Sequence, residues 1–186
     1  REWKPHKIMI NIKLTDKIRQ YAINKVTIKN FGQRSAGFNG KRTEQYTGIL
    51  GECVLHEVLD RPWPTYVDGN LLEDLIINNC TVDVKTMART VDIRDFYVHN
   101  FVGYQKDRPC DVLLFNSINK NTRTTQICGW IPKKEFLEKA DFFPKGSTQH
   151  RANGTSFITE APLHTLQQKF LNQINNVDDI NSLTIS

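Results

Sequence analysis

Apolar residues recur at helical spacing in two stretches of the first third of the chain, and each stretch predicts a helix. The first stretch begins around Thr15-Asp16, which offers an N-cap, and its apolar positions are Leu14, Ile18, Tyr21, Ala22 and Val26. The second covers residues 47–59, is apolar around most of its circumference, and has Thr47 as its expected N-cap.

Glu52 interrupts the apolar surface of the second predicted helix and shares a stripe with His56, four residues later. A helix that is apolar nearly all round is expected to be buried. A charge on such a helix needs a partner or a metal ion. The alternative is an ordinary first-turn glutamate, favoured by the helix dipole.

The pattern changes to period two in residues 71–78 and 81–86, which predicts two strands. Asn79-Cys80 lies between them, and asparagine favours tight turns. If the connecting loop holds an even number of residues, Asp74 pairs with Lys85 and Ile76 with Asp83. Directly paired residues share a face of the sheet, so two carboxylates and an ammonium group would converge.

The rest of the chain predicts strands, then helices. Residues 96–104, 111–115 and 125–131 read as three more strands, with a polar turn over residues 116–124. A short helix is expected from Pro132, and apolar residues at helical spacing predict a long amphipathic helix over residues 163–177.

Composition fits one α/β domain. At 186 residues, with 39% hydrophobic and 24% charged residues, the chain can bury a full core. We expect an N-terminal helix and basic loop over about residues 1–45 and a core over about 46–177. No apolar run approaches membrane-spanning length, and the four cysteines are widely spaced. We therefore expect reduced thiols in a cytoplasmic protein without a membrane partner.

Carboxylates on neighbouring strands supply the hard oxygen ligands that Mg²⁺ prefers. A lysine beside them can hold a phosphate oxygen or orient a water molecule. Asp-x-Lys is a short motif, however, and a surface Asp–Lys pair worth at most about 1 kcal/mol is the alternative.

Taken together, these residues resemble a known superfamily. Gly48-Ile-Leu-Gly-Glu52 on a helix, Glu73-Asp74-Leu-Ile-Ile at a strand and Val82-Asp83-Val-Lys85-Thr on the next strand are similar to the PD-(D/E)XK nucleases. The resemblance implies a restriction-endonuclease-like fold, a mixed central sheet flanked by helices. It also implies a Mg²⁺ site, with Mn²⁺ as a substitute, held by Glu52, Asp74 and Asp83 beside a catalytic Lys85. Asp68 competes with Asp74 as the first aspartate.

The formal net charge of +5 is modestly basic. Phosphate contacts from Lys and Arg supply most of the affinity of nucleic-acid binding. Residues 31–46 combine three glycines with cations and predict a flexible DNA-contacting loop. The expected DNA contacts are Arg34, Lys41, Arg42, Lys145 and Arg151.

The sequence thus suggests a Mg²⁺-dependent deoxyribonuclease, and we expect an endonuclease. The alternative is a non-catalytic nucleic-acid-binding module on the same fold. Whether the chain acts as a homodimer is left open.

Overall fold

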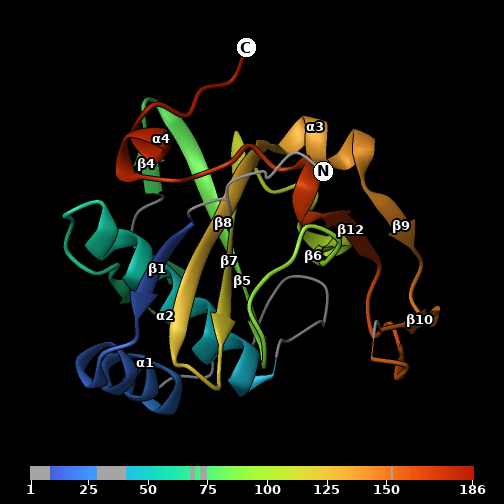
Figure 1. Ribbon diagram of the computed structural model, residues 1–186, viewed down its shortest axis with the longest axis horizontal. Coiled ribbons are helices and arrows are strands. Elements are labelled where there is room, and N and C mark those ends of the chain that lie inside the picture. The colour runs from blue at the N-terminus through green and yellow to red at the C-terminus, as the bar shows by residue number, and fades with distance from the viewer. Residues whose placement is uncertain (1–8, 29–40, 68–69, 72–74, 152) are drawn as a thin grey trace, which may run out of the picture.

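A mixed five-stranded sheet forms the centre of the protein (Figure 1). The computed structural model describes residues 9–28, 41–67, 70–71, 75–151 and 153–186. The strand order is β1 (Ile10–Lys13), β8 (Thr124–Pro132), β7 (Val112–Asn119), β5 (Cys80–Arg89) and β4 (Leu75–Ile77). β5 and β7 pair in parallel, and the other neighbours pair antiparallel. The expected mixed α/β sheet is therefore present.

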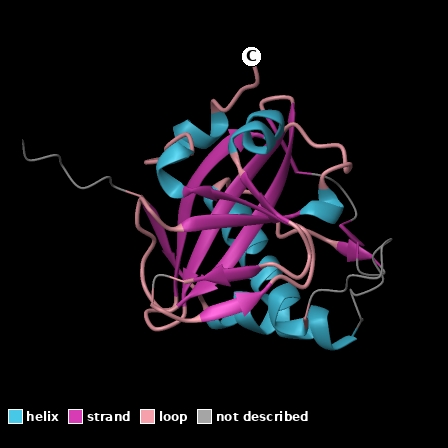
Figure 2. Ribbon diagram, turned by 90° about the vertical axis from the view of Figure 1, so that its right-hand side faces the viewer, coloured by secondary structure: helices cyan, strands magenta, loops and turns pink. Residues whose placement is uncertain are grey.

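A second, three-stranded sheet lies beside the central one. Its order is β6 (Val98–Val102), β12 (Leu163–Gln167) and β9 (Asp141–Phe143). Figure 2, which looks at the molecule from this side, shows its strands in front of the long central strands. The remaining strands form two small two-stranded sheets. One consists of β10 (Thr148–His150) and β11 (Ser156–Ile158), and the other of β2 (Tyr66–Val67) and β3 (Asn70–Leu71).

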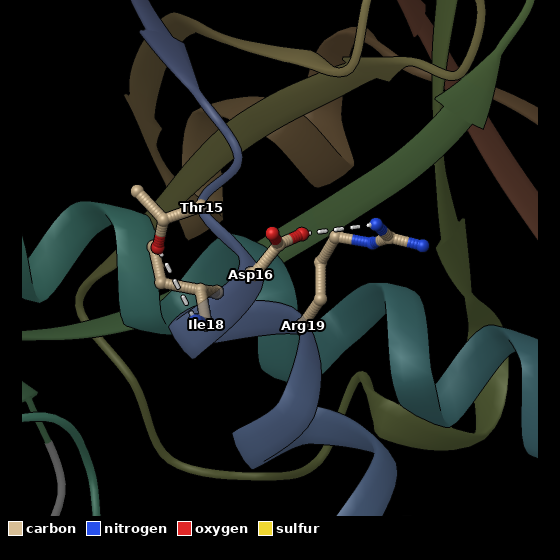
Figure 3. Close-up of polar contacts among 4 residues, drawn as sticks. All are labelled: Thr15, Asp16, Ile18 and Arg19. Carbon is tan, nitrogen blue, oxygen red and sulfur yellow. Dashed lines mark hydrogen bonds and ion pairs between the residues drawn. The ribbon is translucent and has the colours of Figure 1, made fainter.

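The helices are α1 (Asp16–Ile28), α2 (Arg42–Val58), α3 (Lys133–Lys139) and α4 (Val177–Asn181), with short 3₁₀ turns η1 (Gly103–Gln105) and η2 (Gln168–Phe170). The N-cap expected for α1 is confirmed. The Thr15 hydroxyl oxygen accepts from the backbone N–H of Ile18 at 3.3 Å, and Arg19 contacts Asp16 at 3.4 Å (Figure 3). The short helix expected after Pro132 is α3.

Helix α2 begins five residues earlier than the sequence pattern predicts. Lys41 is its N-cap, and the Glu44 carboxylate accepts from the Lys41 backbone N–H at 3.0 Å. This contact satisfies a donor at the helix start without Thr47, whose hydroxyl donates to the Thr43 carbonyl at 2.9 Å. The prediction of a flexible loop that extends to residue 46 is therefore wrong for Arg42–Tyr46, which are helical.

Helix α2 packs tightly on one face of β5, and a glycine permits this. A Cβ atom on Gly51 would lie 1.9 Å from the Thr86 hydroxyl oxygen, so only glycine fits at this contact. The Gly51 carbonyl accepts from the Asn116 side-chain amide of β7 at 3.1 Å. Leu55, one turn later, shares a core cluster with Val82. The even-numbered positions of β5 therefore face α2.

The predicted hairpin is present, but its register differs from the expected one. Asn78 and Asn79 form the turn with φ of 49° and 63°, a left-handed conformation that asparagine tolerates and that two-residue hairpins require. Ile76 consequently pairs with Thr81 and not with Asp83. The turn begins one residue earlier than predicted, and this shifts the pairing by two positions.

The long helix predicted over residues 163–177 is wrong. Leu163–Gln167 form β12, which pairs with β6 on one side and β9 on the other. Two ladders of hydrogen bonds outweigh the helical spacing of the apolar side chains. Beyond the strand, Ile174, Ile180 and Leu183 are fully buried against the central sheet. The predicted turn over residues 116–124 is also too long, because β7 continues to Asn119.

Candidate functional site

Strand β5 places Asp83 and Lys85 on the face of the central sheet that is turned away from α2. The register pairs Asp83 with Leu113 and Lys85 with Phe115 of β7. Both neighbours belong to a core cluster that also contains Phe101 of β6. The Asp83 and Lys85 side chains therefore lie on the side of the three-stranded sheet.

Two partners hold Lys85. Its Nζ lies 2.8 Å from Asp83 Oδ2 and donates to Oε1 of Gln105 at 2.5 Å. Gln105 is buried, whereas the side chains of Lys85 and Asp83 are 20% and 30% exposed. A partly exposed ion pair contributes only about 0–1 kcal/mol of stability. Its main effect is to fix an ammonium group beside a carboxylate that solvent can reach.

A second lysine lies near the same aromatic ring as Lys85. Lys133 at the start of α3 is only 8% exposed, and its ammonium group donates to the backbone carbonyl of Arg108. Its Nζ lies 5.9 Å from the centre of the Phe101 ring, and Lys85 Nζ lies 5.5 Å from the same centre. One aromatic ring therefore contacts both cations.

The Cys110 thiol is subject to the charges of Asp83, Lys85 and Lys133. Burial raises its pKa, and the Asp83 carboxylate raises it further. The ammonium groups of Lys133 and Lys85 oppose this rise, since they favour the thiolate. Cys110 is half-buried, while the other three cysteines are fully buried. The candidate site therefore contains one accessible thiol.

The connection between β6 and β7, residues 103–111, supplies several of these groups. It contributes the Gln105 amide, the Arg108 carbonyl and Cys110. Asp111 fixes its far end, because its Oδ2 accepts from the backbone N–H of Thr81 at 2.9 Å and from the Thr81 hydroxyl at 3.1 Å. The Asp111 carboxylate therefore links the start of β5 to the start of β7.

Glu52 lies on α2, the helix that covers the opposite face of β5. The Tyr66 hydroxyl donates a hydrogen bond to its carboxylate. Burial raises the pKa of Tyr66, and the neighbouring Glu52 charge raises it further. Burial and then Glu52 likewise raise the pKa of Cys53 to about 12. The described contacts of Glu52 are thus with the α2 surroundings, and they do not include Asp83 or Lys85.

Of the three carboxylates expected to bind metal, Asp83 is the one that the structure sets beside Lys85. Asp74 lies outside the described residues, as does Asp68. Within the part of the chain that is described, no group of three or more His, Cys, Asp and Glu side chains is arranged to hold a metal ion. Asp83 fits as one oxygen ligand, and the ligands that would complete a Mg²⁺ site are not among its described neighbours.

Four of the expected DNA-contacting cations lie among the described residues, and all four are exposed. Lys41 Nζ lies 3.7 Å from Glu160, and Lys145 precedes Gly146, which donates to the Thr159 carbonyl at 2.8 Å. Both cations are therefore close to residues 159–160. Arg42 is exposed at the start of α2, and Arg151 lies over the Phe157 ring at 4.5 Å. Arg34 lies outside the described residues.

Sequence reasoning missed Gln105, Lys133 and Cys110. Gln105 follows a strand pattern and Lys133 begins a helix, and neither position carries a local signal of chemistry. Only the pairing of β6 with β12 and of β7 with β8 brings them to Lys85.

Comparison of the chain with protein-family models, with curated proteins and with solved structures finds no match. Among the described residues, none of the helices combines the length and apolar character needed to cross a membrane.

Proposed function

We propose that this protein is a Mg²⁺-dependent deoxyribonuclease with a restriction-endonuclease-like fold. The observation that carries the proposal is the Asp83–Lys85 pair, 2.8 Å apart and partly exposed on a central strand of a mixed sheet. It supports the proposal because phosphodiester hydrolysis needs an oxygen ligand for the metal and a cation near the reacting phosphate. The resemblance of residues 48–52, 73–77 and 82–86 to the PD-(D/E)XK nucleases adds to it.

The bound metal would neutralise the scissile phosphate and lower the pKa of a bound water molecule. Asp83 would be one metal ligand, and Asp74 and Glu52 remain the proposed further ligands. Glu52 would have to leave Tyr66 and reach around the sheet, because α2 covers the face of β5 opposite to Asp83. Lys85, held by Gln105 and Asp83, would orient the attacking water or stabilise the charge of the transition state.

DNA is the proposed partner, and an endonuclease the proposed type. The exposed cations Lys41, Lys145 and Arg151, the last in the turn between β10 and β11, would supply contacts to the phosphates. Such contacts predict binding that weakens steeply as salt rises.

The test is cleavage of supercoiled plasmid and of a single-stranded oligonucleotide, with Mg²⁺, Mn²⁺ or EDTA. We expect nicked and linear plasmid with either metal and intact plasmid with EDTA. Absence of cutting of both substrates at every metal concentration would contradict the proposal.

A non-catalytic nucleic-acid-binding module is the second candidate. The position of Glu52 on the far face of β5, bonded to Tyr66, favours it. The same preparation separates the two candidates. Tight, salt-sensitive DNA binding without cutting supports the binding module, whereas metal-dependent cutting supports the nuclease.

A further inference from the structure

Lys133 is a buried lysine whose positive charge has no carboxylate ion-pair partner among the described residues. It is 8% exposed, and no carboxylate of the described residues forms an ion pair with it. Its described partners are the Arg108 carbonyl and the Phe101 ring. An ammonium group has three donors, and a buried charge is costly unless it is paired. Lys133 therefore has hydrogen-bonding capacity and positive charge available for an anion.

The position of Lys133 defines which anion would suit it. Its ammonium group lies against the same ring as that of Lys85, and both ammonium groups act on the Cys110 thiol. Asp83 neutralises Lys85 at 2.8 Å but does not form an ion pair with Lys133. The Asp83 and Asp111 carboxylates and the two ammonium groups all act on this thiol, and among the described residues Lys133 forms an ion pair with neither carboxylate.

We propose that Lys133 and Lys85 together form a phosphate-binding site, in which Lys133 holds a non-bridging oxygen of a backbone phosphate of the nucleic acid. The identification of the phosphate as part of DNA rests on the proposed function. The site differs from the exposed cations Lys41, Lys145 and Arg151, because Lys133 is buried and Lys85 is only partly exposed. The site would fix the position of the DNA strand relative to Asp83, whereas the exposed cations would mainly add affinity.

A purely structural lysine is the competing explanation, since the Arg108 contact ties residues 103–111 to α3. A matched pair of variants separates the two. Lys133→Met keeps most of the side-chain volume and removes the charge. Lys134→Met removes a charge from the neighbouring, exposed position on the same helix.

The experiment measures the affinity for a fluorescent DNA duplex by anisotropy in EDTA, where no cleavage occurs, over a range of salt concentrations. We expect Lys133→Met to weaken binding roughly tenfold and to lower the slope of log K against log salt by about one. Lys134→Met should stay within about twofold of the wild type, and Lys133→Arg should recover most of the affinity. Urea unfolding of each variant shows whether it is folded.

Equal affinities and slopes for Lys133→Met and Lys134→Met would overturn the proposal, and so would a wild type that does not bind DNA. If Lys133→Met does not fold, acetic anhydride labelling of the wild type decides. Protection of Lys85, the partly exposed member of the site, by bound DNA, read by mass spectrometry, supports the site, and unchanged labelling of Lys85 contradicts it. Loss of binding in Lys133→Met with a wild type that never cuts DNA would support this site and defeat the nuclease proposal.

Discussion

Acid should destabilise this protein through one buried histidine. His99 on β6 is fully buried, lies 4.8 Å from the Phe115 ring and shares a hydrogen bond of 2.6 Å between its Nε2 and the Gln168 side-chain oxygen. Nε2 is therefore the donor, and Nδ1 has no hydrogen-bond partner among the described residues. A second proton on Nδ1 would place a charge in the core without an acceptor. Burial accordingly lowers the pKa of His99 from 6.5 to about 4.

The sign and the size of the effect follow from this pKa. Below pH 6.5 the unfolded chain binds a proton that the folded chain binds only near pH 4. The contribution of His99 to stability is therefore complete above pH 6.5 and falls as the pH drops from 6.5 to about 4. At about 1.4 kcal/mol per pKa unit, the loss is about 3 kcal/mol.

Urea unfolding followed by tryptophan fluorescence at pH 7, 5.5 and 4 measures this loss. Other groups also titrate in this range, so the comparison is with His99→Gln, which keeps a donor but does not titrate. The wild type should lose about 3 kcal/mol more than the variant between pH 7 and pH 4. Equal losses would refute the reasoning. Because Phe101 lies two residues along the same strand and contacts Lys85, acid should also disturb the candidate site.

Two further predictions concern packing and the accessible thiol. Gly51→Ala should destabilise the protein by about 1–3 kcal/mol, because the new Cβ would lie 1.9 Å from the Thr86 hydroxyl oxygen. Gly48→Ala, which meets no atom within 4 Å, should be neutral or slightly stabilising in the same urea titration, and equal effects would contradict the packing argument. Iodoacetamide should label Cys110 before the three buried cysteines. Asp83→Asn should shift the pH midpoint of that labelling downward, since the Asp83 charge raises the pKa of the thiol, and an unchanged midpoint would show that the carboxylate is not near it.

Local patterns predicted the elements whose own residues determine them. Thr15 caps α1, and period-two alternation marks the first half of β5. The Asn78-Asn79 turn could have been placed correctly, because both positions need positive φ and asparagine tolerates it. The predicted Asn79-Cys80 turn would have required a positive φ at Cys80, which a cysteine seldom adopts.

Long-range pairing explains what the sequence did not predict. β12 has helical apolar spacing and becomes a strand because β6 and β9 flank it. The Asp83–Lys85 pair follows from strand alternation alone, whereas Gln105 and Lys133 reach it from 20 and 48 residues away along the chain. For Glu52 the local prediction of a helix was correct, but the sequence did not show that α2 covers the face of β5 opposite to Asp83.

The most direct test of the central claim is the rate of Mg²⁺-dependent plasmid cleavage by the wild type, Asp83→Ala and Lys85→Ala, with Lys134→Ala as the control. Each protein is compared at an equal folded fraction. We predict a loss of about 100-fold or more in both site variants, since each removes a charge that acts on the transition state, and an unchanged rate in the control. Full metal-dependent cleavage by Asp83→Ala would show that the reaction centre lies elsewhere.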